Sequence, residues 1–191
     1  MASPESWDET ALISITCAGS HTNTFNIAAI TETIDIDLGD RDGESIASLS
    51  GGRLWKRTPE ADTTLTFEGY PVGIGDIDST TADGLLSNFF YGTVATQPLK
   101  ETSVSLSRNV YSVYILWTNK TTAVWATESI ATPSAALRYK FAKCYLVSCK
   151  PSFTDGVLKA TWKFKCAPRQ KDGTANITVE STDGTASLPT L

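Results

Sequence analysis

Five acidic side chains fall close together in this 191-residue chain, and carboxylates at such spacing can bind calcium or act as an acid–base pair. They are Asp35, Asp37, Asp40, Asp42 and Glu44. An EF-hand loop with its glycine at Gly43 needs carboxylates at positions where Leu38 and Leu49 stand. Asp35 and Asp37 share one strand face, as a glycosidase pair would. We expect a solvated acidic face, and a nonstandard calcium site and a glycosidase pair remain as alternatives.

Other catalytic patterns fail on residue type. His21 is the single histidine, so a His-based triad and a two-His metal site each lack a member. Neither a G-x-S-x-G elbow nor a glycine-rich phosphate loop ending in Lys-Ser/Thr occurs. We therefore expect no catalytic residue, no metal, no cofactor and no enzymatic activity.

The cysteines are Cys17, Cys144, Cys149 and Cys166, and no two of them form the C-x-x-C pair of a zinc site. Cys144 and Cys149 are an odd number of residues apart, which predicts opposite faces of one strand. The hairpin register derived below places Cys166 about 13 Å from Cys149, beyond disulfide reach. We expect reduced, packed thiols.

A basic and aromatic cluster follows the acidic residues; its members are Arg53, Trp55, Lys56 and Arg57. Such a cluster stacks on nucleic acid or docks on an acidic protein surface. The net charge is −5 and the pI about 4.9, whereas nucleic-acid binders are normally basic. Because the chain carries its own acidic surface, we favour docking on another subunit.

The elements that would position these residues are strands, most clearly a long β-hairpin. Its apolar residues occupy odd positions on the first arm and even positions on the second: Leu137, Tyr139, Phe141, Tyr145, Val147 and Cys149, then Leu158, Ala160, Trp162, Phe164 and Cys166. Asp155-Gly156 between the arms favours a two-residue type I′ turn. Closure there pairs residue i with residue 311 − i, so Cys149 meets Trp162, Val147 meets Phe164 and Phe153 meets Leu158.

Alternation predicts further strands at 13–17, 30–38, 65–71, 104–117, 123–126 and 177–179. The run Val110 to Trp117 is apolar on both faces, so it is either central in a sandwich or covered by a neighbouring subunit. A stripe at Leu85, Leu86, Phe89 and Phe90 predicts one short helix at about 81–91. Residues 39–62 form a long polar loop in which Ile46 and Leu49 allow one helical turn.

Length and composition fit one mainly β domain over residues 1–191, with flexible arms at 1–9 and 181–191. The N-terminus is polar and acidic and lacks the apolar region of a signal peptide. No apolar run approaches the ~18 residues that span a bilayer. We expect synthesis in the cytoplasm and no membrane insertion, so the glycosylation patterns at Asn119 and Asn176 are chance matches.

In the order and character of its segments the chain resembles a major tail tube protein of a long-tailed (siphovirus-like) bacterial or archaeal virus. The segments are TETIDIDLGDRDG, a long loop, TLTFEGYP, a helix near LLSNFF, LRYKFAKCYLVSCKPSF and DGVLKATWKFKCAPRQKDGTANI. The resemblance covers about residues 30–180 and departs from a minimal pattern at 119–136. It implies a β-sandwich or half-barrel packed on one short helix.

The resemblance also implies a structural virion protein located in the tail. Its copies would join in rings, usually of six, that stack into a tube through which viral DNA passes without specific binding. The loop at 39–62 and the two arms would contact a neighbour or the next ring. Other tail proteins, such as the tape measure and the tail terminator, would be its further partners.

Ring closure requires two different, complementary patches on each subunit. We expect Asp35 and Asp37 to face the lumen, where carboxylates repel DNA phosphates. The expected contacts between subunits are Asp40, Asp42, Glu44, Arg53, Trp55, Lys56, Arg57, Tyr111, Val113, Ile115 and Trp117. One rival is a carbohydrate- or receptor-binding β-sandwich that stacks Trp55, Trp117 or Trp125 on sugars; another is a hydrolase that uses the acidic pair.

Overall fold

The computed structural model describes residues 10–18, 24–39, 43–47, 51–57, 61–71, 110–119, 125–131 and 134–191. The elements in this part of the chain are β1 (Thr10–Ala18), β2 (Thr24–Ile30), the 3-10 helix η1 (Thr31–Thr33), β3 (Asp35–Asp37), β4 (Gly43–Ala47), β5 (Arg53–Arg57), β6 (Thr63–Pro71), β7 (Val110–Thr118), β8 (Ala135–Thr154), β9 (Val157–Cys166) and β10 (Ile177–Asp183). The helix predicted at 81–91, the arm at 1–9 and the strand residues predicted at 104–109 lie outside it.

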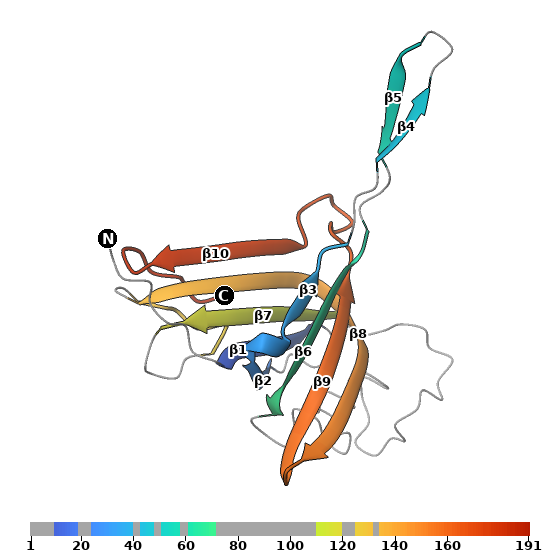
Figure 1. The fold of residues 1–191 in the computed structure, drawn as a ribbon. Helices are drawn as coiled ribbons and strands as arrows, with labels where there is room; N and C mark the ends of the chain where they lie inside the picture. Colours follow the sequence, from blue (N-terminus) through green and yellow to red (C-terminus); the bar gives the residue numbers. More distant parts are fainter. Residues whose placement is uncertain are drawn as a thin grey trace.

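Strand β8 organises the fold because it is twenty residues long and pairs along both edges. β7 lies along one edge, while β10 and β9 share the other edge in succession. Pairing continues from β8 through β7, β1, β2, β6 and β9 back to β8, so six antiparallel strands close a barrel (Figure 1). The mainly β prediction is confirmed, but the sheet is a closed barrel rather than a sandwich or half-barrel.

The predicted hairpin register holds near its turn. Cys149 pairs with Trp162 and Phe153 with Leu158, and the turn residues Asp155 and Gly156 have φ of 52° and 77°. Both positive values fit a type I′ turn. The core-facing even positions of β9 are likewise confirmed, since Ala160, Trp162, Phe164 and Cys166 are buried.

The register shifts by one residue between Leu146 and Ser148, where β8 has a bulge. Leu146 rather than Val147 therefore pairs with Phe164. A second irregularity lies where β8 faces β7 between Tyr111 and Val113. Each extra residue reverses which side chains face inward, and bulges also bend the strand. The prediction that inward and outward side chains alternate along the whole first arm is therefore wrong. The bends allow one long strand to follow the curvature of a closed barrel.

Between these two irregularities the inward and outward positions are exchanged. Cys144 and Leu146 are buried in the core, whereas Tyr145 and Val147, which were predicted to be core residues, are 46% and 43% exposed. Cys144 and Cys149 both pack in the core cluster, so the prediction that they point to opposite faces is also wrong.

The strand predicted at 30–38 is confirmed only at β3, because residues 31–33 form η1 and residue 30 is the end of β2. Both strands pair with β6, β2 near Gly69 and β3 around Leu65. The Thr33 hydroxyl supports the break between them, because it accepts the Glu68 N–H at 2.9 Å and donates to the Ile30 carbonyl at 2.8 Å. The break bends the chain around β6 and thereby helps to close the barrel.

Aromatic side chains fill the barrel. Phe67 stacks on Trp162 with ring centroids 5.6 Å apart, and Tyr111 meets Phe164 edge-on at 6.0 Å. All four side chains are fully buried. Burying large apolar side chains of this kind stabilises the fold by about 2–3 kcal/mol each.

A second apolar cluster covers the outer face of β7 and β8. It comprises Leu116, Ala126, Ile130, Ala136 and Leu188. Ile130 and Leu188 exchange both backbone hydrogen bonds, at 2.8 and 2.9 Å. The segment predicted to fray from residue 181 instead begins as part of β10 and returns to the barrel. The sequence predicts that β7 is either central in a sandwich or covered by a neighbouring subunit. In the structure, other segments of the same chain cover both of its faces.

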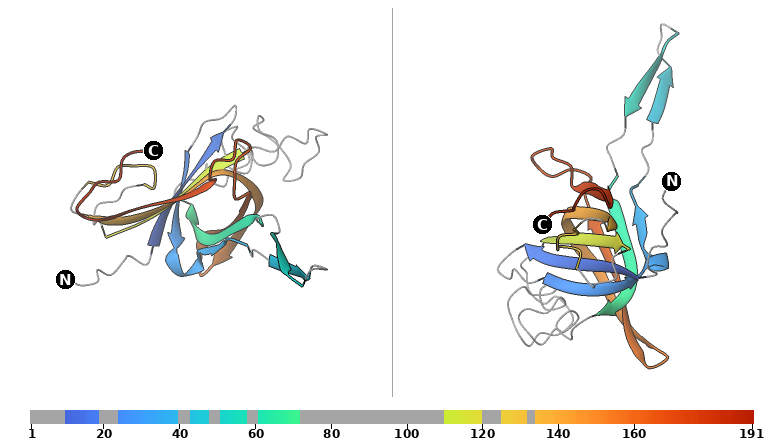
Figure 2. Two further views of the ribbon diagram at one scale, coloured as in Figure 1. Left: turned by 90° about the horizontal axis from the view of Figure 1, so that it is seen from above. Right: turned by 90° about the vertical axis from the view of Figure 1, so that its left-hand side faces the viewer.

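The segment predicted as a polar loop contains a β-hairpin. β4 and β5 pair antiparallel, with Ile46 opposite Leu54 and Ala47 opposite Arg53, so the helical turn expected at Ile46 is not present. Leu49 lies outside the described residues. The two strands form a separate sheet that stands away from the barrel (Figures 1 and 2).

Candidate functional site

No group of three or more His, Cys, Asp and Glu side chains in the described part of the chain could hold a metal ion. His21, Asp40 and Asp42 lie outside that part. Among the same described residues, no helix has the length and apolar character needed to cross a membrane.

The lysine-bearing strand β9 lies one strand away from the acidic strand β3, with β6 between them. Asp35 and Asp37 are exposed, and the Asp37 carboxylate accepts the Gly39 N–H at 2.9 Å. Through β6 the register continues from Asp35 to Lys163 and from Asp37 to Lys165. Since all four residues are exposed, carboxylates and ammonium groups share one outer surface. The sequence predicted the acidic strand but not that the lysine-bearing strand lies near it.

Two ion pairs also lie on this surface. Lys165 is 3.2 Å from Asp62, and Lys159 is 3.9 Å from Glu68. The Lys159 ammonium additionally lies 5.6 Å from the centre of the Tyr70 ring. The surface of β3, β6 and β9 is therefore mixed in charge, not uniformly acidic.

The basic cluster occupies the free hairpin. Arg53, Trp55, Lys56 and Arg57 all belong to β5, and Glu44 lies opposite Lys56 on β4. The structure thus brings part of the predicted acidic segment and the whole basic cluster together on one two-stranded sheet. That sheet reaches away from the barrel and is available for contacts beyond it (Figure 1).

Three of the expected contact residues belong to the core. Tyr111, Val113 and Ile115 are fully buried inside the barrel. Trp117 is partly buried, and its ring meets that of Tyr139 edge-on at 5.6 Å. These side chains of β7 are therefore core residues and not surface contacts.

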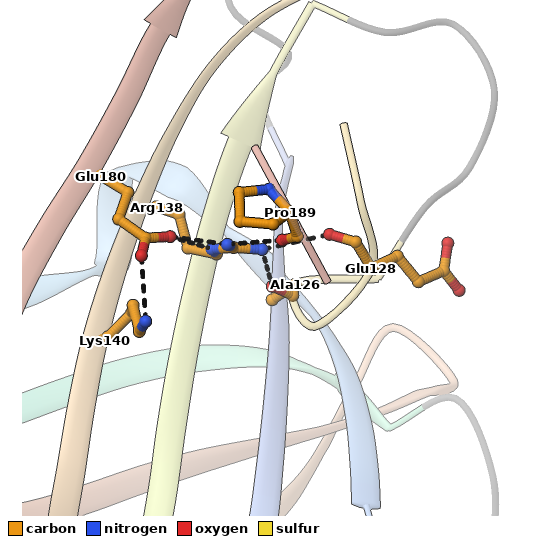
Figure 3. A network of polar contacts seen from close by, with 6 residues as sticks. All are labelled: Ala126, Glu128, Arg138, Lys140, Glu180 and Pro189. Carbon is orange, nitrogen blue, oxygen red and sulfur yellow. Dashed lines mark hydrogen bonds and ion pairs between the residues drawn. The ribbon is translucent and has the colours of Figure 1, made fainter. Parts of the chain in front are cut away.

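The outer face of β8 holds a fully buried arginine that sequence reasoning missed (Figure 3). The Arg138 guanidinium donates to one Glu180 carboxylate oxygen from Nε at 3.0 Å and from Nη2 at 2.6 Å. It also donates to the carbonyl oxygens of Ala126, Glu128 and Pro189 at 3.3, 3.1 and 2.8 Å. All five N–H donors of the group are thereby used. The sequence did contain one signal for this site: Arg138 lies on the face of β8 opposite to the neighbouring apolar residues.

Glu180 completes this network, which we call the Arg138 clamp: Arg138, Glu180, Lys140 and the three carbonyls. Lys140 donates to the second Glu180 oxygen at 2.9 Å. Partial burial by itself raises the pKa of the Glu180 carboxyl, but the hydrogen bonds from Arg138 and Lys140 outweigh it and hold the pKa below its usual value. The clamp joins β8, β10, the segment 125–131 and the end of the chain.

Two thiols meet inside the barrel. Cys144, Cys149 and Cys166 are free, and Cys144 shares a hydrogen bond with Cys166, a pair that the predicted register did not bring together. That hydrogen bond and burial raise the pKa of Cys144 well above its ordinary value. Burial alone raises the pKa of Cys149 to about 12. The thiols of Cys144 and Cys149 are therefore protonated at neutral pH, whereas the contact with Cys144 lowers the pKa of Cys166.

Buried Asn176 fills the point where β8 passes from β10 to β9. Its amide donates to the carbonyls of Lys143 and Ala167 at 2.9 and 2.7 Å, and its oxygen accepts the Lys143 N–H at 2.9 Å. The side chain thus takes the place of a strand residue at the branch point. This engagement agrees with the expectation that its glycosylation pattern is a chance match.

A shallow depression of about 370 Å³ opens on the outer surface near this branch point. Its lining residues are Asp62, Tyr145, Val147, Lys165, Cys166 and Ala167. The outward-facing Tyr145 and Val147 give it an apolar wall, and the Asp62–Lys165 ion pair lies at its rim. Because the bulge at Val147 turns these two side chains outward, the depression is a consequence of the register shift.

Comparisons with known proteins show a shared fold. No family model and no curated protein match the sequence. A chain in the cryo-EM structure of the anti-feeding prophage baseplate matches with a TM-score of 0.51 and 12% identity, over 94% of this chain and 97% of that one. A chain in the sheath/tube terminator of the PVC extracellular contractile injection system has a TM-score of 0.44 and 12% identity, over 88% and 92%. The first of these likenesses shows that this chain shares the fold of a chain in the anti-feeding prophage baseplate.

Proposed function

We propose that this chain is a structural subunit of a phage-tail-like particle. Its copies would join into rings of six subunits, and the rings would stack into a tube. The observation that carries the proposal is the match to the baseplate chain, which spans almost the whole of both chains at a TM-score of 0.51. That baseplate was solved with six-fold symmetry applied. The same proposal places the chain in the tail of the particle. It would contact other tail proteins there, such as a tape measure and a terminator.

The ends of the sheet support lateral joining. In the described part of the chain the strand order ends at β10 on one side and at β3 on the other. Edge strands with free backbone groups favour pairing with another chain, and a ring removes such edges. Two different edges on one subunit also satisfy the heterologous contact that a closed ring requires.

The β4–β5 hairpin would supply a second contact. It stands away from the barrel and carries Arg53, Trp55, Lys56 and Arg57 on one strand (Figure 2). We propose that it reaches a neighbouring subunit, with the acidic residues 40–44 taking part. Charge complementarity in such contacts sets register and specificity more than affinity.

Asp35 and Asp37 remain our candidates for the lumen wall. The lysines of β9 on the same surface reduce its net negative charge, so repulsion of DNA would be weaker than an acidic strand alone implies. Passage of a genome without specific binding agrees with such a mixed surface. We propose no catalytic activity for the chain and no insertion into a membrane.

Sugar binding gains no support from the tryptophans whose side chains are described. Trp117 packs against Tyr139 and Trp125 is half-buried, so neither offers a free ring face like those that bind sugars. We therefore advance no second function.

Electron microscopy and sedimentation of the purified chain over a range of concentrations test the proposal. We expect rings and tubes for the natural chain, and loss of assembly when residues 43–57 are replaced by a short Gly-Ser linker. Because β4 and β5 form their own sheet, the shortened chain should keep the circular dichroism and thermal unfolding of the barrel. A natural chain that remains a monomer at every concentration would overturn the proposal.

A further inference from the structure

The tip of the β8–β9 hairpin exposes a phenylalanine. Phe153 is 77% exposed, the highest value among the large apolar side chains in the described part of the chain. It lies next to the tight Asp155-Gly156 turn, and the hairpin extends beyond the barrel (Figure 1). A paired two-stranded tip holds this side chain in a defined place, so Phe153 forms a fixed apolar knob on the surface.

The depression near the branch point lies farther back on the same two strands. Its apolar wall is formed by Tyr145 and Val147, and Val147 precedes Phe153 by six residues, or ~20 Å of extended strand. Its volume of about 370 Å³ exceeds the ~150 Å³ of a cavity that holds benzene. A phenylalanine ring therefore fits into it, but Phe153 of the same copy cannot reach it along a rigid hairpin.

We propose that Phe153 of one copy inserts into the depression of another copy, so that subunits stack head to tail. The proposal rests on the proposed function and adds to it the axial contact between successive rings. A knob and a hole at different places on one subunit make a heterologous contact, which closes a ring if its rotation closes and otherwise repeats as an open stack. We assign this contact to the stack, because the sheet edges at β10 and β3 are the proposed contact that closes the ring.

Exposed charges around the two sites are complementary. The tip carries Lys150 and Asp155, and the rim of the depression carries Asp62 and Lys165. Each side thus carries one ammonium and one carboxylate, and the Asp62–Lys165 pair would exchange partners with Lys150 and Asp155 of the other copy. Opposite charges at the edge of an apolar contact fix its register and exclude the reversed orientation.

The bulge in β8 is a further argument for a built surface. Regular alternation would bury Val147 opposite Phe164, as the sequence predicts. The shift between Leu146 and Ser148 instead buries Leu146 and leaves Val147 43% exposed in the wall of the depression. Bulges commonly redirect a side chain for a purpose outside the sheet.

Two complementary variants test the contact. Phe153→Asp removes the knob and keeps the depression, whereas Val147→Arg fills the depression and keeps the knob. Val157→Asp is the matched control, because Val157 is 46% exposed on the same tip but lies outside both sites. All three positions are exposed, so the variants should fold, and circular dichroism and thermal unfolding check this.

We expect each of the two variants alone to form single rings and to need a protein concentration about thirtyfold higher for stacking, as for loss of a central interface residue. Rings of the two variants, assembled separately and then mixed in equal amounts, should form stacks of two rings and no longer ones, because only one pairing of knob and hole remains. The control should form tubes like the natural chain.

The outcomes separate the two proposals. If the natural chain forms tubes and both variants do so equally well, or if the mixture never stacks while each variant folds, the axial contact is wrong and the tail role stands. If the natural chain forms rings that never stack, the axial contact is also wrong. If it forms no rings at all, the proposed function fails, and the axial contact fails with it.

Discussion

The two faces of the β7–β8 pair are buried in different ways. The inner face contributes Tyr111, Val113, Ile115 and Phe141 to a fully buried aromatic and aliphatic core. The outer face lies under the second apolar cluster, and there a fully buried Arg138 lies among backbone carbonyls and Glu180. One face is covered by regular strands of the barrel and the other by segments without regular pairing.

This difference teaches what each covering layer needs. Strands satisfy their own backbone hydrogen bonds, so a layer of strands needs only apolar side chains of the right shape inside. The segments 125–131 and 184–191 have carbonyls that no ladder satisfies, and a guanidinium can supply five donors to them. We infer that the inner face depends on volume and the outer face on specific donors, and the predictions below test that contrast.

Trp162→Ala should produce the largest loss of stability, about 4 kcal/mol, because it removes a fully buried ring stacked on Phe67. Urea denaturation with a constant m value measures it. Trp162→Phe is the control, since it keeps a ring and removes an indole N–H that has no hydrogen-bond partner among the described residues. We expect it to cost about 1 kcal/mol. Equal losses in both variants would contradict a core that depends on volume.

Arg138→Met should cost about 3 kcal/mol, because it leaves buried carbonyl oxygens without donors although it keeps much of the side-chain volume. Lys140→Met is the matched control: Lys140 contacts the same carboxylate but its side chain is 27% exposed, so its loss should cost less than ~1 kcal/mol. If the two variants unfold at the same urea concentration, the clamp does not hold the outer layer.

The same contrast explains what the sequence could predict. Alternation identified β1, β6, β9, the first part of β10 and the Asp155-Gly156 turn; the signal is clearest in β6 and β9, where every second side chain is buried. It misjudged Tyr145 and Val147, since a bulge is an extra residue whose place depends on the curvature of the closed barrel and not on local composition. Nothing in residues 137–166 alone indicates that β8 must bend twice.

Residues with polar partners from distant segments were equally hard to predict. Arg138 joins β8 to positions near 126 and 189, and no local pattern links these segments. The β4–β5 hairpin was missed because residues 39–62 are polar and glycine-rich, which indicates a loop unless the pairing of 43–47 with 53–57 is known. The candidate contact residues on β7 were misplaced because an apolar run does not show whether its own chain or another covers it.

Removal of residues 184–191 should have a smaller effect, about 2 kcal/mol, because it exposes one side of the second cluster and takes away Leu188 and the Pro189 carbonyl. Hydrogen exchange should then rise at Ile130, whose N–H bonds to Leu188, and remain unchanged at core positions such as Ile15. An equal rise at both positions would show that the end of the chain supports the whole barrel and not the outer layer.

The smallest effect concerns Glu180 and depends on pH. Hydrogen bonds from Arg138 and Lys140 lower the pKa of its carboxyl in the folded chain, although partial burial opposes them. The ionised carboxylate therefore adds stability that is fully present above the unfolded-state pKa, near 4.5, and is lost as the pH falls through the lower folded-state pKa. Glu180→Gln should cost about 1 kcal/mol at neutral pH, and this difference from the natural chain should vanish in acid.

The difference in unfolding free energy between the Glu180→Gln variant and the natural chain removes the influence of other acidic residues. The pKa values of Asp172 and Asp183 are also lowered, by hydrogen bonds from Thr174 and Thr185, but both residues are present in both proteins and their effects cancel. Urea denaturation of each protein from neutral to acid pH gives the measurement. If the difference in unfolding free energy stays constant over this range, Glu180 acts by its shape and not by its charge. The outer face would then depend on side-chain shape, as the inner face does.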